Sequence, residues 1–370
     1  MDFNLREETR MLKSNAEKFL KEKAPSSAVK NLLSGEMGFS PALWKEMADL
    51  GWLGLIYPEP CGGSGGDFFD LFVLCEELGR AVLPSPFFCS AVFAGLLLCE
   101  GGDEKVRKEV LPPMAEGKKI LTVGLRDEKG LYDHLSPSLE ARESAPGSYR
   151  VTGTRILVPY AHAAEEILVC ARLGSSGPTL FRTPSRGPGV RATPLPTLSG
   201  EKNSAVTYAE APADLLGAPG KGDRYVEGVM PKLITLKCGE MVGGLSRVVD
   251  MTVEYVKQRV QFGRPLGALQ VVHHYCADMV TFLDTARLVA YQAASLLSAG
   301  LPCAKEVAMA KAWCSDAYKK VTQVAHQLHG GIGFTEEHDL HLYYKHAKTA
   351  ELDFGDSWFH RQKVAAEMGL

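Results

Sequence analysis

Residues 259–270 read Arg-Val-Gln-Phe-Gly-Arg-Pro-Leu-Gly-Ala-Leu-Gln, and residues 327–335 read Gln-Leu-His-Gly-Gly-Ile-Gly-Phe-Thr. Either stretch alone is a weak signal, because glycines also mark turns and helix ends. The two stretches are informative as a pair, since the chain between them predicts two long helices.

Apolar residues around this pair recur three and four positions apart, which predicts amphipathic helices. The spacing places one helix through residues 245–256, a second through 269–286 and a third through 307–328. Such regular spacing is typical of the shallow crossings of an antiparallel helical bundle. A free coiled coil is the alternative, but the short polar loops at residues 264–265 and 300–302 favour a bundle.

The pattern changes twice along the chain. The first segment is rich in helical spacing, and the second is rich in proline and glycine between short β-rich runs, which predicts a small antiparallel sheet or barrel. These β-rich runs are residues 120–123, 149–151, 156–158, 167–170 and 179–181. We therefore predict an α+β fold with an N-terminal helical domain (1–118), a middle β domain (119–225) and a C-terminal four-helix bundle (226–370).

The composition narrows the class of protein. The 370 residues carry a net charge of -3, so the chain lacks the excess of positive charge that binding to nucleic acid or to an acidic membrane surface requires. No apolar run reaches the length of a membrane span, and the polar N-terminus is neither a secretory signal nor a transit peptide. The nine cysteines form no C-x-x-C pair, which predicts buried reduced thiols. We expect a cytoplasmic protein with no nucleic-acid partner and no membrane insertion.

The histidines give no metal signature. His326 and His329 lie one helical turn apart, and His273 and His274 are adjacent. Neither pair has a carboxylate or cysteine partner at ligand spacing, so we expect no metal site.

The two stretches together resemble the C-terminal half of the acyl-CoA dehydrogenases, flavoproteins that oxidise the α,β bond of CoA thioesters. The family's Pro-Glu-x-x-Gly-Gly loop is matched by Pro58-Glu-Pro-Cys-Gly-Gly63, and its following helix by Glu76-Glu-Leu78. Because the family has the same helical, β, helical order, the resemblance spans essentially the whole chain. It implies FAD as cofactor, an acyl-CoA substrate in fatty acid degradation, an electron-transfer flavoprotein as acceptor and a tetramer built as a dimer of dimers.

The resemblance also implies which residues hold FAD across a subunit interface. An arginine supplies charge to the pyrophosphate, and glycines let the backbone approach the cofactor. In the C-terminal domain these residues are Arg259, Gln261, Phe262, Gln327, Gly330 and Gly331. In the middle domain the positions beside the flavin ring are Val123, Leu157 and Pro159. Pro159 replaces a threonine of the family, which removes a hydroxyl and a backbone N–H.

The catalytic base of the family is missing. Aligned without gaps, the usual glutamate position falls on Phe354, which cannot take a proton. A second branch of the family carries its glutamate near the position of residues 233–234, which are Leu and Ile here, and Glu240 lies almost two turns further along. Asp353 is our first candidate for a displaced base and Asp356 the second.

Both readings of Asp353 remain open. Burial against Phe354, Trp358 and Phe359 would raise the pKa of an aspartate toward that of a useful base. The alternative is a local role for Asp353, as a helix cap or as the salt-bridge partner of Lys348.

Three functions fit these residues. The first is a self-sufficient FAD-dependent dehydrogenase with a displaced carboxylate. The second is one subunit of a heterotetramer whose paralogous subunit carries the base. The third is a non-redox acyl-CoA lyase or desulfinase on the same fold. A fourth alternative, a helical adaptor protein that has lost flavin, is disfavoured because such a protein would need neither residues 259–270 nor residues 327–335. The segments 87–93 and 233–243 are expected to shape the acyl pocket.

Overall fold

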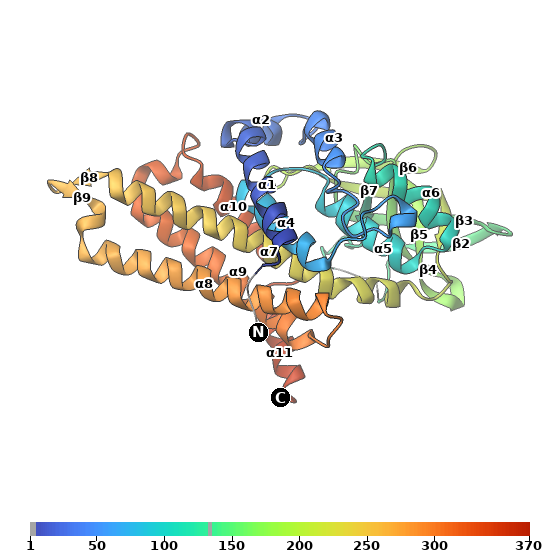
Figure 1. Cartoon of the computed structure of the whole chain (residues 1–370). Coiled ribbons are helices and arrows are strands. Elements are labelled where there is room, and N and C mark those ends of the chain that lie inside the picture. The colour runs from blue at the N-terminus through green and yellow to red at the C-terminus, as the bar shows by residue number, and fades with distance from the viewer. Residues whose placement is uncertain (1–4, 132–134) are drawn as a thin grey trace. The chain divides into compact units, whose positions relative to one another are not determined.

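The computed structural model describes residues 5–131 and 135–370 (Figure 1). Two compact units emerge from the contacts between residues. The helical unit contains residues 5–30, 67–83 and 231–370, and the sheet unit contains residues 31–66 and the described part of 84–230. The predicted order of helical, β and helical segments is confirmed, while the boundaries at residues 118 and 225 stay a prediction.

The helical unit is organised around α9 (Ala304–His329), which packs against α8 (Gln270–Ser298), α10 (Leu340–Leu352) and α11 (Ser357–Glu367). Its Tyr318 hydroxyl lies against Gly244 of α7 (Gly222–Gln258), where a Cβ atom would come within 2.1 Å of the oxygen. The other helices here are α1 (Glu7–Lys23) and α4 (Phe68–Ala81), while α2 (Ser26–Ser34) and α7 cross the boundary between the units.

The predicted apolar faces are buried in these helices. Leu245, Val249 and Val256 of α7 are at most 4% exposed, and Thr252 between them is fully buried. The same holds for most of the predicted positions of α8 and α9, including Met279, Ala286, Ala310, Cys314 and Val321. The three-and-four spacing therefore predicted the packing faces of the bundle correctly.

The sheet unit is built on seven strands within the described residues. They are β1 (Leu121–Gly124), β2 (Glu140–Ala145), β3 (Ser148–Pro159), β4 (Glu166–Leu173), β5 (Gly177–Pro184), β6 (Val190–Leu195) and β7 (Asn203–Leu216). The order β4-β2-β3-β7-β5 closes on itself because β5 also pairs with β4, which gives a barrel-like ring. The predicted antiparallel sheet or barrel is corrected in one respect, since β4 pairs in parallel with both β1 and β2.

The remaining elements of the sheet unit are helical. They are α3 (Pro41–Asp49), a π-helical segment (Phe88–Ala94), α5 (Gly95–Gly101), α6 (Glu104–Ala115) and two short 3-10 helices (Glu59–Cys61 and Gly174–Ser176). The π-helical segment falls on the stretch expected to shape the acyl pocket, and such segments are frequent at functional sites.

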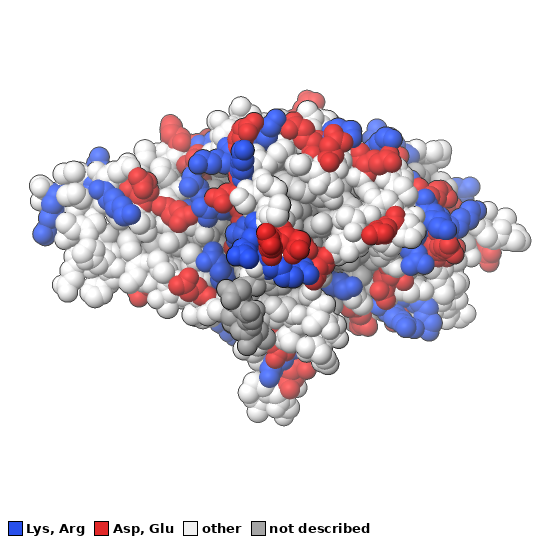
Figure 2. Space-filling model, in the orientation of Figure 1, with Lys and Arg blue, Asp and Glu red and all other residues white. Residues whose placement is uncertain are grey.

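Charges of both signs are interspersed over the face of the molecule in Figure 2. In the part of the chain that the structure describes, no helix has the length and apolarity needed to cross a bilayer.

Candidate functional site

The first predicted cofactor stretch forms a hairpin between α7 and α8, at the end of these helices in Figure 1. Its strands are β8 (Val260–Gln261) and β9 (Arg264–Pro265), which pair antiparallel. Phe262 and Gly263 join them with φ angles of 55° and 74°, the two positive values that a tight two-residue hairpin loop requires. The Phe262 side chain is 84% exposed. Because a large apolar ring on a surface favours contact with a partner or ligand, Phe262 marks this hairpin as a binding surface.

The second predicted cofactor stretch forms the corner where α9 ends. Gly330 has φ 65° and ψ -142°, a conformation that side chains strongly disfavour. A Cβ atom on Gly330 or Gly331 would meet nothing within 4 Å, and Gln327 is exposed beside them. The corner therefore leaves open space against bare backbone.

An aromatic contact brings the two stretches together. The Tyr255 ring, one turn before Arg259, stacks on His329 with 4.3 Å between the ring centroids. The Tyr255 hydroxyl also donates a hydrogen bond to the His329 carbonyl oxygen at 3.3 Å. Tyr255 and His329, more than seventy positions apart in sequence, thus meet at one edge of the helical unit, and the exposed Arg259 lies one helical turn beyond Tyr255.

The three predicted cofactor residues of the sheet unit lie on β1 and β3. Val123 is 5% exposed, so it offers backbone rather than side chain. The neighbouring Thr122 hydroxyl donates to the Pro159 carbonyl oxygen at 2.6 Å, which ties the two strands together. Leu157 has a φ of 52° where the β3–β7 register shifts. A bulge with a left-handed, non-glycine residue is a strained feature of the kind found beside active sites.

The two candidate bases have different surroundings. Asp356 precedes α11, and its carboxylate accepts a hydrogen bond from the Phe359 backbone N–H at 2.9 Å. This is an N-cap, which gives Asp356 a structural role. Asp353 follows α10, and its Oδ2 lies 3.6 Å from Lys237 Nζ.

Two expectations about Asp353 are corrected. The Lys348 ammonium contacts Glu351 at 2.8 Å, and Asp353 forms an ion pair with Lys237 of α7. Within the chain, Trp358 and Phe359 are 65% and 42% exposed, so they form no apolar enclosure of the kind expected.

The loop that carries Asp353 is held by two buried side chains. Lys311, fully buried on α9, donates to the carbonyl oxygens of Glu351 at 2.9 Å and Gly355 at 2.8 Å. His360 Nε2 donates to the carbonyl oxygen of Phe354 at 2.8 Å. Phe354 itself has a φ of 59° and is 5% exposed. Phe354, which the sequence predicts at the family's usual base position, is therefore packed inward on a fixed backbone.

His360 predicts a pH dependence of stability. Burial lowers the pKa of His360 from 6.5 to about 4. Between these values the unfolded chain binds a proton that the folded chain does not, so the free energy of unfolding falls as the pH drops from 6.5 toward 4. We expect His360→Gln to remove about 2 kcal/mol of this loss at pH 4.5. Urea unfolding of both proteins at pH 7 and pH 4.5 measures it, and equal pH dependences would contradict the prediction.

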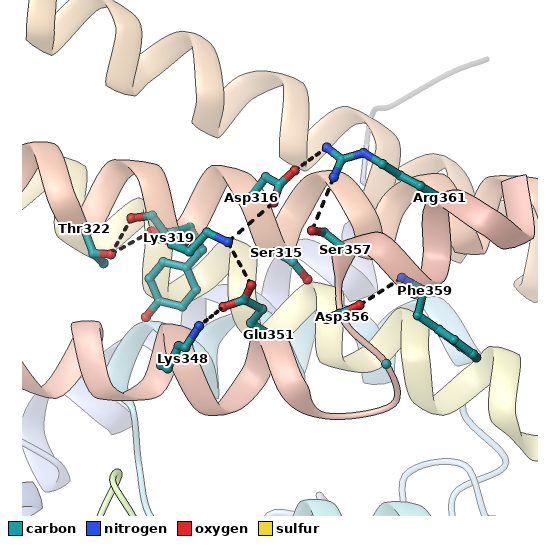
Figure 3. A network of polar contacts seen from close by, with 12 residues as sticks. Ser315, Asp316, Lys319, Thr322, Lys348, Glu351, Asp356, Ser357, Phe359 and Arg361 are labelled. Atoms are coloured by element: carbon teal, nitrogen blue, oxygen red, sulfur yellow. Dashed lines mark hydrogen bonds and ion pairs between the residues drawn. The ribbon is translucent and has the colours of Figure 1, made fainter. Parts of the chain in front are cut away.

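A polar network next to this loop joins α9, α10 and α11 (Figure 3). Glu351 lies between Lys319 and Lys348, each at 2.8 Å. Asp316 contacts Lys319 and forms an ion pair with Arg361. These ion pairs fix the three helices that surround the Asp353 loop.

A second buried polar cluster was missed from the sequence. We call Lys237, Glu240, His346 and Tyr318 the Glu240 cluster. Lys237 Nζ lies 2.8 Å from Glu240 Oε2, His346 Nε2 lies 2.6 Å from Glu240 Oε1, and the Tyr318 hydroxyl lies 3.1 Å from His346 Nδ1. Burial would raise the pKa of Glu240, but Lys237 and His346 outweigh it and hold that pKa at about 2.

A sequence signal for this cluster does exist. Lys237 and Glu240 interrupt a run of buried apolar residues on α7, in which Leu236, Cys238 and Met241 are fully buried. Charged residues are rarely buried without a partner, so two of them one turn apart in such a run indicate a paired site. His346 and Tyr318 give no such signal, because only tertiary contacts bring them to Glu240.

No metal site accompanies these residues. Throughout residues 5–131 and 135–370, no group of three or more His, Cys, Asp or Glu side chains is placed to hold a metal ion. The nine cysteines are free thiols, and seven of them are buried.

Two family models cover both ends of the chain. Residues 6–118 match the acyl-CoA dehydrogenase N-terminal domain, and residues 234–369 match the acyl-CoA dehydrogenase C-terminal domain. The acyl-CoA dehydrogenase IpdE2 of Mycolicibacterium smegmatis is 30% identical over 342 residues, which cover 92% of this chain and 92% of that protein. The chain belongs to the acyl-CoA dehydrogenase family.

Other acyl-CoA dehydrogenase relatives span the full chain. The acryloyl-CoA reductase (NADH) of Anaerotignum propionicum is 28% identical over 383 residues, which cover 100% of this chain and 96% of that protein. The solved ChsE4-ChsE5 complex of Mycobacterium tuberculosis matches with a TM-score of 0.90 and 27% identity, over 100% of this chain and 99% of that one.

FAD is the cofactor of this family, and the residues of this chain fit it in part. The space beside Gly330 and Gly331 admits a ligand against the backbone, and the exposed Arg259 offers a cation suited to a pyrophosphate. The fit is poorer after α10, where the carboxylate of Asp356 would repel a phosphate. That carboxylate already caps α11.

Proposed function

We propose that this chain is an FAD-dependent oxidoreductase that acts on the α,β carbon–carbon bond of an acyl-CoA thioester and passes electrons to an electron-transfer flavoprotein. The observation that carries the proposal is the edge formed by the Phe262 hairpin and the Gly330–Gly331 corner. Tyr255 and His329 hold these two stretches together. A protein that had lost its cofactor would have no use for bare backbone facing open space.

The chain's own residues would bind and position the cofactor and move one proton. Arg259 and Gln261 supply donors at the hairpin, while Gly330 and Gly331 allow close approach of the backbone. When bound, FAD supplies the acceptor for the hydride of the β-carbon. Asp353 would take the α-proton as a general base, since Asp356, the other candidate carboxylate, caps α11.

As the alternative to a base on Asp353, we propose an assembly with a paralogous second subunit that carries the base, giving a heterotetramer rather than a homotetramer. Support comes from Phe354, which is buried on a fixed loop at the family's usual base position. The matching structure titled as a ChsE4-ChsE5 complex supports the same assembly. In this arrangement Arg259 and the glycine corner would complete a flavin site shared with the partner. A non-redox lyase or desulfinase activity is a third candidate function, but none of the residues described here supports it.

Flavin content tests the assembly. The chain is expressed alone and together with a paralogue from its own genome that retains the family's glutamate, and each sample is analysed for mass and bound flavin. If the partner carries the base, flavin and a stable tetramer form only after co-expression. If Asp353 is the base, the chain alone forms a flavin-loaded homotetramer. A flavin-loaded homotetramer from the chain alone would contradict the heteromeric proposal and leave the dehydrogenase proposal standing.

A further inference from the structure

We infer that Tyr57 is a positioning residue that holds the segment Phe88–Ala94 in π-helical register, and that this register makes the protein select compact acyl groups over long straight chains. The inference rests on the proposed function, since it concerns the acyl group of a CoA thioester. It also gives a role to the glycine-rich loop at residues 58–66, which the proposed cofactor contacts leave unused.

The hydrogen bonds of the segment follow π-helical spacing. The Val92 N–H donates to the carbonyl oxygen of Phe87, five residues earlier, at 3.1 Å. The Gly95 N–H donates to the carbonyl oxygens of Ser90 and Val92, whereas an α-helix would pair it with Ala91, four residues earlier. The π-helical register therefore takes from the Ala91 carbonyl oxygen the donor that it would have in an α-helix.

Tyr57 supplies a donor to this carbonyl oxygen from outside the helix. Its hydroxyl donates to the Ala91 carbonyl oxygen at 2.7 Å, and the Tyr57 side chain is fully buried. A buried carbonyl oxygen that loses a donor is unfavourable. Without the Tyr57 hydroxyl, the Gly95 N–H would be drawn back to Ala91, which is the α-helical register.

Glycines allow Tyr57 to come this close to the segment. A Cβ atom at Gly95 would lie 2.3 Å from the Tyr57 hydroxyl oxygen and 2.4 Å from its Cε1. The Tyr57 backbone is held by the loop, because its carbonyl oxygen accepts a hydrogen bond from the Gly65 N–H at 3.0 Å. A Cβ atom at Gly63 would lie 2.2 Å from the same oxygen. The glycine-rich loop thus sets the position from which Tyr57 reaches the segment.

The first turn of the segment is fixed separately from the second. The Ser90 N–H donates to the Pro86 carbonyl oxygen at 2.8 Å, and Ser90 Oγ accepts a hydrogen bond from the Leu121 N–H of β1 at 3.2 Å. The extra residue of the π-helical turn lies between this anchor and α5. Loss of that turn would rotate the first turn by about 100° relative to α5, because an α-helix advances by that angle with each residue.

Phe88 is the side chain through which the register acts on the acyl group. It is half-buried, whereas Phe87 and residues 89–95 are buried, so Phe88 is the large ring that the segment presents at its surface. Residues 87–93 are the stretch that the family resemblance predicts at the acyl pocket, and the ring takes up room there that a long straight chain needs. One methylene group changes the discrimination of a hydrophobic pocket by about 10–200-fold, so a rotated ring is enough to change the acyl preference.

The test is the binding of S-butyl-CoA and S-octyl-CoA to the flavin-loaded assembly, measured by isothermal titration calorimetry. These thioethers lack the thioester carbonyl, so the enzyme cannot oxidise them. We expect Tyr57→Phe to shift the ratio of the two dissociation constants at least about tenfold in favour of S-octyl-CoA. Gly95→Ala, whose methyl group would displace the Tyr57 ring, should shift the ratio in the same direction.

Tyr208→Phe is the matched control. Its hydroxyl is also buried in the sheet unit, where it accepts a hydrogen bond from Thr183. We expect this variant to keep the ratio within about twofold of the wild type, since it leaves the pocket unchanged. A crystal structure of Tyr57→Phe completes the test, and it should show the Gly95 N–H paired with Ala91.

The inference would be overturned by a π-helical register that persists in Tyr57→Phe, by an unchanged ratio in that variant, or by an equal shift in Tyr208→Phe. Failure of the wild type to bind either thioether would also overturn it. None of these measurements involves oxidation, so they are separate from the proposed function. A Tyr57-dependent acyl preference without oxidation of any CoA thioester would refute the dehydrogenase proposal and retain the inference. A thioester-oxidising enzyme whose preference ignores Tyr57→Phe would do the reverse.

Discussion

Asp353→Asn is expected to slow flavin reduction by an acyl-CoA at least about a hundredfold, because an amide cannot take the α-proton and general-base catalysis contributes about 10²–10⁴ to rate. Flavin content should stay unchanged, since the Asp353 side chain belongs to none of the predicted cofactor stretches. Rapid mixing of the oxidised enzyme with substrate under anaerobic conditions measures the rate directly. Because Asn has nearly the shape of Asp, the fold should be preserved.

Asp356→Asn is the matched control for this prediction. Its carboxylate caps α11 by accepting from Phe359 N–H, and asparagine caps helices about as well as aspartate. We expect the rate of flavin reduction to stay within about threefold of the wild type, since Asp356 has no part in the proton transfer described. A normal rate in Asp353→Asn would place the base on the partner subunit, and a large loss in Asp356→Asn would make that residue the base.

Gly331→Ala is expected to lower bound flavin at least about tenfold while leaving the stability of the chain unchanged or slightly higher. A Cβ atom at Gly331 meets nothing within 4 Å of the protein itself, so the folded chain has room for a methyl group. A cofactor that approaches this backbone does not. Flavin absorbance per chain and the midpoint of thermal unfolding separate the two effects.

Gly330→Ala provides the contrast one residue earlier. Its φ of 65° and ψ of -142° are strained for alanine, at a cost of about 1–3 kcal/mol, although space is equally open there. We expect this variant to lose both stability and flavin. If Gly331→Ala binds flavin as well as the wild type, the glycine corner is a turn and not a cofactor contact.

The helical part of the fold was predictable because its burial repeats with the period of the helix. Val249 and Val256 on α7, like Ala310 and Val321 on α9, follow that period and are buried. The strands of the sheet were harder to predict from the sequence. β7 (Asn203–Leu216) escaped because its sequence mixes Glu, Pro and Asp with apolar residues, and the parallel pairings of β4 depend on contacts that no local pattern encodes.

The candidate site divides in the same way. Arg259, Phe262 and Gly330 could be named because the stretches that contain them resemble motifs of the acyl-CoA dehydrogenases. The surroundings of Asp353 could not. Lys348 is closer to it in sequence, but α10 directs that lysine to Glu351, and Lys237 reaches Asp353 from another helix. Which cation a carboxylate meets is decided by tertiary packing.

The most direct test of the whole account is the visible spectrum of the purified, flavin-loaded assembly during anaerobic addition of CoA thioesters with straight, branched and cyclic acyl groups. We predict that at least one thioester bleaches the flavin, that the product carries a new α,β double bond, and that an electron-transfer flavoprotein restores the colour. A flavin that stays oxidised while a thioester is cleaved or loses another group would contradict the dehydrogenase function and favour the lyase.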